Sequence, residues 1–179
     1  MSVYPAGNVE DREMVKKIPT KKFLDYFFLQ VRNLWRVDGL YFLGIEKKFG
    51  TEAATEIDAG VWETMAEIEA KGLQRMFDVS ENPDVATIMS LLRKSNWALD
   101  QPFKTVETSS KQAILGIDRC RTQEARLSKG LEEFPCKKVR FGYLKRFVET
   151  LNPDVKVKCM VCPPDKHPKD SWCKWEFTL

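Results

Sequence analysis

The spacing of apolar residues changes once along this chain, near Trp97, and that change constrains the fold more than any other feature. Before Trp97, apolar residues recur three and four positions apart, which is the spacing of one helical face. After it, short segments rich in Thr, Val and Ile are separated by turn residues, which is typical of strands. One helical segment interrupts them, so the order is helices followed by ββαββ. This order predicts an α+β fold: a four-stranded antiparallel sheet with helices packed on one side.

The first half is predicted to be helical throughout. Asp38-Gly39 is expected to break or bend the first helix, and Gly50 to end the second. Asn82-Pro83, a cap residue followed by proline, is a typical helix start. The expected helices are 20–36, 40–49, 51–77 and one with Pro83 in its first turn.

The second half is predicted to hold two hairpins on either side of a helix, which Asn152-Pro153 ends. The expected elements are strands 103–108 and 112–120, helix 138–151, and strands 155–162 and 171–179. We expect an N-terminal extension over 1–19 and a single domain over 20–179, with a helical half (20–97) and a sheet half (98–179).

Composition excludes several classes of protein. With 179 residues, a net charge of +3 and a hydrophobic fraction of 43%, the chain is neither disordered nor strongly basic, which argues against nucleic acid as a partner. One histidine excludes two-histidine metal sites, and five cysteines argue against a fully paired disulfide framework. We see no signal peptide or membrane span, so we expect a cytoplasmic protein without a membrane partner. Motifs of α/β-hydrolases, kinases and nucleotide-binding loops are absent.

The most specific feature is a late cluster of thiols. Cys159, Cys162, His167 and Cys173 follow one another with two, four and five residues between them. Zinc takes four nitrogen or sulfur ligands, so this spacing favours a zinc site. Strand alternation directs Cys159 and Cys173 inward, and Cys159 is therefore the expected core thiol, whereas Cys162 at the strand end is freer to act. If the hairpins are neighbours, the remaining thiols converge. The candidate metal ligands are Cys120, Cys136, Cys162, His167 and Cys173.

Two other interpretations of the cysteines stay open. Free cysteines often only fill space in a core. A redox-active or nucleophilic thiol is the third possibility, and nearby lysines favour the thiolate in any role. Heme of the nitric-oxide-binding kind is not expected, because it needs a proximal histidine on a helix and His167 lies in a Pro-rich loop.

Charge is distributed unevenly along the chain. Residues 41–79 hold eight acids and four bases, whereas 137–179 hold five acids and ten bases, which favours intramolecular complementarity or a head-to-tail homodimer. Asp38 and Glu46 are candidates for a general base, or for binding the positive end of a ligand. Arg121, Gln123 and Arg126 are candidates for binding a ligand carboxylate, since Arg matches that geometry. The alternative for all of them is a solvated surface with helix caps.

Several segments resemble known families. The segments are 37–43, 45–50, Cys120-Arg121-Thr122-Gln123, Phe134-Pro135-Cys136 and 162–168. They resemble an uncharacterised family of cytosolic proteins from anaerobic bacteria and archaea, whose relatives are L-2-amino-thiazoline-4-carboxylate hydrolase-like. The part from Cys120 onward is also similar to the 4-vinyl-reductase-type domain. The resemblance implies metal-ligand roles for the late cysteines. It also implies the fold of heme–nitric-oxide-binding domains and TRAPP vesicle-tethering subunits.

Three classes of function follow. The first is a cytoplasmic small-molecule-binding domain with a cysteine-rich zinc site. The second is a hydrolase acting on a C–N bond of a small heterocycle or amide, using metal-bound water or a thiolate. The third is a homodimeric interaction protein, for which Phe27, Phe28, Trp35 and Trp62 are the residues to inspect.

Overall fold

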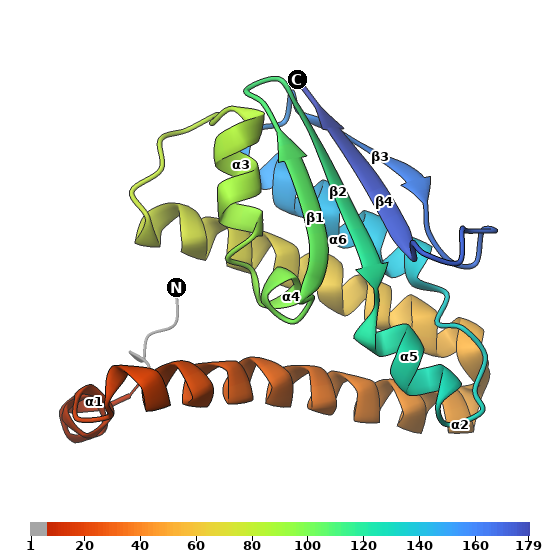
Figure 1. Ribbon diagram of the computed structural model, residues 1–179, viewed down its shortest axis with the longest axis horizontal. Coiled ribbons are helices and arrows are strands. Elements are labelled where there is room, and N and C mark those ends of the chain that lie inside the picture. Colours follow the sequence, from red (N-terminus) through yellow and green to blue (C-terminus); the bar gives the residue numbers. More distant parts are fainter. Residues whose placement is uncertain (1–6) are drawn as a thin grey trace.

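The computed structural model describes residues 7–179 and has the predicted α+β architecture (Figure 1). Its sheet has four antiparallel strands in the order β1-β2-β4-β3. The strands are β1 (Phe103–Thr108), β2 (Gln112–Arg119), β3 (Lys156–Val161) and β4 (Cys173–Thr178). The helices are α1 (Val9–Lys16), α2 (Thr20–Met76), α3 (Val85–Leu92), α4 (Asn96–Leu99), α5 (Arg121–Leu127) and α6 (Cys136–Leu151).

Strand alternation decides which face of the sheet is covered. In β4, Cys173, Trp175 and Phe177 are buried, while Lys174 between them is exposed, as the alternation predicts. Strand β2 pairs with β4 and so joins the two predicted hairpins into one sheet. Helices α3 and α6 pack on the covered face, and α2 packs along α6. The core therefore lies between the sheet and the helices.

Helix α2 differs from the prediction. No break occurs at Asp38-Gly39; the helix runs from Thr20 to Gly50, where the backbone turns with φ 87° and ψ 165°. One glycine inside a helix costs only about 1 kcal/mol relative to alanine, which packing of neighbouring residues offsets. The conformation at Gly50 is nearly restricted to glycine. We call residues 20–49 the first arm of α2 and 51–76 the second arm; Figure 1 shows the second arm turning back beneath the sheet.

Short elements escaped the sequence analysis. Helices α4 and α5 have four and seven residues, too few to show a helical period. The predicted extension 1–19 contains α1, capped by Asn8 and Asp11, while residues 1–6 lie outside the described part. Over residues 7–179, we find no helix that combines the length and the apolar character needed to span a membrane.

Candidate functional site

A cavity of about 320 Å³ lies between the first arm of α2, α5 and the beginning of α6. Its size is at the small end of ligand cavities. Aromatic and charged side chains both line it, and the aromatic residues are Trp35, Phe42, Trp62, Trp97 and Phe134. Trp35 and Trp62 stack with their ring centroids 4.5 Å apart, which fixes the two arms of α2 against each other.

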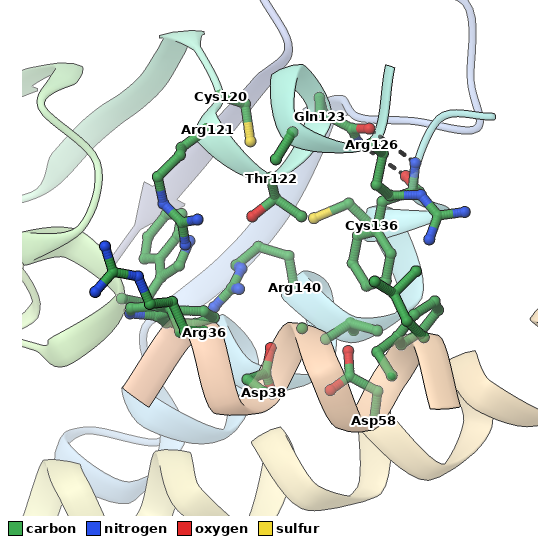
Figure 2. A pocket seen from close by; sticks show the side chains of 18 of the residues that line it. Arg36, Asp38, Asp58, Cys120, Arg121, Thr122, Gln123, Arg126, Cys136 and Arg140 are labelled. Atoms are coloured by element: carbon green, nitrogen blue, oxygen red, sulfur yellow. Dashed lines mark hydrogen bonds between the residues drawn. The ribbon is translucent and has the colours of Figure 1, made fainter. Parts of the chain in front are cut away.

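Arg140 occupies the centre of this aromatic surround (Figure 2). Its guanidinium carbon lies 4.4 Å from the Trp97 ring centroid and 5.0 Å from that of Tyr143, and only 4% of the residue is exposed. Cation–π attraction stabilises the charge there. Its Nε and Nη1 have no hydrogen-bond partner in the described part of the chain. Arg140 therefore has two N–H groups free to bind an acceptor.

Gln101 adds an unpaired acceptor to the same cavity. The residue is 2% exposed, and its Oε1 has no hydrogen-bond partner within residues 7–179. Buried polar groups are nearly always hydrogen-bonded, because an unpaired one costs about 1–3 kcal/mol. The cavity thus combines apolar walls with unpaired donors and an unpaired acceptor.

A pair of carboxylates lies on the α2 side of the cavity. Asp38 comes from the first arm and Asp58 from the second, and Figure 2 shows both beneath Arg140. Asp38 Oδ1 accepts a hydrogen bond of 2.9 Å from Trp62 Nε1. Burial raises the pKa of Asp38. Burial and the charge of Asp38 raise the pKa of Asp58 to about 7, so near neutral pH the two acids share a proton.

The thiol of Cys136 also lines the cavity, at the first residue of α6. A hydrogen bond from Cys162, assisted by the charge of Arg140, lowers the pKa of Cys136 to about 7. Hydrogen bonds with Cys136 and Cys173 raise the pKa of Cys162, which is fully buried. Burial raises the pKa of Cys120, a further cavity residue, to about 12.

The predicted metal ligands are only partly brought together. Cys136, Cys162 and Cys173 are neighbours through their thiols, whereas His167 stacks on Trp172 and lies 3.4 Å from Glu133. Over residues 7–179, no three Cys, His, Asp or Glu side chains are arranged to hold a metal ion. As they lie, these residues do not fit a zinc ion.

All five cysteines are free. Two of them, Cys162 and Cys159, lie in surroundings that differ from the prediction. Cys162 was expected to be accessible at its strand end, but it is fully buried beneath the beginning of α6. Cys159, expected in the core, is only half-buried and lines a separate surface groove.

The predicted ligand-binding residues divide into two groups. Asp38 lines the cavity, and its carboxylate accepts one hydrogen bond from Trp62 and forms no salt bridge within residues 7–179. The polar groups of the others bind within the protein. Arg126 binds Glu46 through two hydrogen bonds of 2.9 and 3.0 Å, which lower the pKa of Glu46. Arg121 binds Asp100 at 2.7 Å, and Gln123 exchanges two hydrogen bonds with the Phe134 backbone. These bonds hold α5 in place as one wall of the cavity.

The sequence analysis missed Arg140, Asp58 and Gln101. Arg140 did have a signal, since it stands three and seven residues before the buried Tyr143 and Phe147 and so lies on the apolar face of its helix. A charged residue at such a core position is rarely buried without a partner. The sequence holds no such signal for Asp58 and Gln101. They join Asp38 in the cavity lining only because the chain reverses at Gly50 and folds around α4.

The fold and the site define an α+β domain with a partly open cavity lined by aromatic and charged side chains. Comparison with family models matches residues 16–179 to a family of unknown function, DUF6125, and the chain belongs to that family. A search of the curated proteins returns no match. The resemblance to hydrolase-like and 4-vinyl-reductase-type proteins therefore stays a prediction.

Proposed function

We propose that this chain is a small-molecule-binding domain whose ligand is an organic anion held in the cavity by Arg140. One observation carries the proposal: a guanidinium that is 4% exposed leaves Nε and Nη1 without a partner and faces a cavity. A carboxylate accepts hydrogen bonds from Arg in a fork geometry and compensates a buried positive charge. The Trp and Phe rings that line the cavity favour a planar, apolar body for the same ligand.

Binding of carboxylates to the purified protein tests this proposal. We expect aromatic carboxylates to raise the melting temperature, and Arg140→Met to abolish the rise. Arg146→Met is the matched control, because Arg146 is on the same helix but exposed and paired with Glu67. If Arg140→Met and Arg146→Met bind the carboxylates equally well, the proposal is wrong.

A hydrolase acting on a C–N bond is the second candidate. Cys136 and Arg140 both line the cavity, so a ligand bound to Arg140 has a nucleophile in the same cavity. Turnover of aminothiazoline carboxylate that disappears in Cys136→Ala supports this candidate. If turnover survives in Cys136→Ala, Cys136 is not the nucleophile of such a hydrolase.

Zinc is a separate proposal, supported by the contacts of Cys162 with Cys136 and Cys173. It requires these thiols to move onto a common centre, since they do not form a ligand group as they lie. Elemental analysis of protein purified without chelators is the test. Less than about a tenth of an equivalent of zinc rules the proposal out, given how tightly structural zinc binds.

A homodimer is also proposed, formed through the first arm of α2. Residues 21–30 are all exposed although most of them are apolar, including Phe23, Phe27 and Phe28. A helix that is apolar on most sides is normally buried, and exposed patches of this kind mark interfaces. Trp35 and Trp62, by contrast, are buried within one chain. Light scattering of the wild type and of Phe27→Glu/Phe28→Glu, with a monomeric mass expected for the variant, tests the dimer.

A cytoplasmic location, supported by the five free thiols, stays part of the proposal.

A further inference from the structure

The pair formed by Asp38 and Asp58 is not explained by anion binding, because two carboxylates repel an anion. Both side chains line the cavity, they come from the two arms of α2, and each affects the pKa of the other. The salt bridges within residues 7–179 go to other acids, such as Asp100 and Glu46. No positive side chain is therefore bonded directly to this pair in the described part of the chain.

The groups that face the pair from neighbouring elements do not neutralise it. Arg140 on α6 and Arg121 on α5 act on Asp38 through their charges, while Cys136 on α6 opposes ionisation of Asp58. Trp62 supplies an N–H to Asp38. Arg121 is bonded to Asp100, and Arg36, a further cavity residue, donates to Asn33. The two carboxylates beside Arg140 therefore leave room for one more positive charge, or for the proton that they share in its place.

We propose that the ligand carries a protonated nitrogen group, held between Asp38 and Asp58, in addition to the anionic group held by Arg140. The ligand class is then a zwitterion with a planar aromatic ring, of the kind that aromatic amino acids represent. This inference rests on the proposed function and narrows it.

Three features of the cavity support this ligand class together. Arg140, Asp38 and Asp58 all line the cavity, and Figure 2 shows the two acids beneath Arg140, as the adjacent charges of an amino acid require. The unpaired Oε1 of Gln101 offers the ammonium group a further acceptor. The cavity volume of about 320 Å³ admits a ring but not a large ligand.

Matched sets of three compounds test each charge by itself. The probes are L-tryptophan, indole-3-propionate, which lacks the amino group, and tryptamine, which lacks the carboxylate, together with the corresponding sets for tyrosine and phenylalanine. In calorimetry, we expect at least one amino acid to bind about ten-fold or more tightly than either of its analogues, since each analogue leaves a polar group of the site unpaired.

Two variants test which side chain binds the amino group of the ligand and which binds its carboxylate. Asp58→Asn should remove the preference for the amino acid over the compound without the amino group, and Arg140→Met should remove the preference over the amine. Asp25→Asn, an exposed change on the same helix, should preserve both preferences.

Binding of the amino acid at about pH 6 should also release protons, because the ammonium group replaces the proton that the two acids share. The release is measured as a binding heat that depends on the ionisation enthalpy of the buffer.

The possible outcomes distinguish failure of this inference from failure of the proposed anion binding. If the compounds without the amino group bind as tightly as the amino acids, the inference is wrong and anion binding stands. If simple aromatic carboxylates bind but none of the amino acids does, the inference is also wrong. If no carboxylate of either kind binds, the proposed function fails with it.

Discussion

Replacement of Asp58 by Asn should change the pH dependence of stability. The folded chain holds the pKa of Asp58 at about 7, against an ordinary value of 3.8. A raised acid pKa means that the folded state binds more protons than the unfolded state. Its stability therefore falls as pH rises through this window, from about 4 to about 7. Integrating the linkage relation between about pH 5 and about pH 8 gives a loss of about 2.5 kcal/mol from this group.

Asn does not ionise, so the variant should lack this loss. We expect Asp58→Asn to exceed the wild type in free energy of unfolding at about pH 8, and to gain about 2.5 kcal/mol relative to it between about pH 5 and about pH 8. Carboxylates with lowered pKa values, such as Glu46, change stability in the opposite direction and below this window. Urea denaturation at both pH values measures the difference, with Asp25→Asn as the control. Parallel changes in wild type and Asp58→Asn would refute the shared proton.

Three further results are expected. Gly50→Ala should destabilise the fold by about 1–3 kcal/mol in urea denaturation, because φ 87° and ψ 165° are nearly restricted to glycine; an unchanged midpoint would mean that the turn between the arms adapts. Asp100→Ala should cost about 1–3 kcal/mol, since it removes a buried carboxylate that two partly exposed arginines bind at 2.7 Å; an unchanged free energy of unfolding would show that water replaces it. At about pH 7, iodoacetamide should modify Cys136 at least about ten times faster than the buried Cys162, measured by peptide mass spectrometry; equal rates would contradict the thiolate character of Cys136.

Much of the fold was predictable because its signals are local. The helical and alternating periods of the apolar residues identify the two halves, and in β4 they predict correctly that Cys173, Trp175 and Phe177 face the core. Breaks of α2 were predicted both at Asp38-Gly39 and at Gly50, and only the one at Gly50 occurs, because a glycine in sequence does not reveal its backbone angles. Only the packing of the arms, through Trp35 on Trp62, decides which glycine bends.

The candidate site was less predictable, since it depends on partners distant in sequence. Arg126, Gln123 and Asp38 carry groups able to bind a ligand, and sequence alone does not distinguish them. The structure shows that Arg126 and Gln123 are bonded within the protein, whereas Asp38 faces Asp58 and Arg140 in the cavity.

The sequence by itself determined the class of fold and the order of its longer elements, and it identified Asp38 among the residues that line the cavity. The tertiary structure decided which of those residues have their hydrogen bonds satisfied and which do not. The reason is physical. Periodicity is a property of neighbouring residues, whereas the hydrogen bonds that a buried group such as Arg140 leaves unsatisfied depend on all the residues packed around it. The unpaired groups in this cavity arise only where α2, α5 and α6 meet.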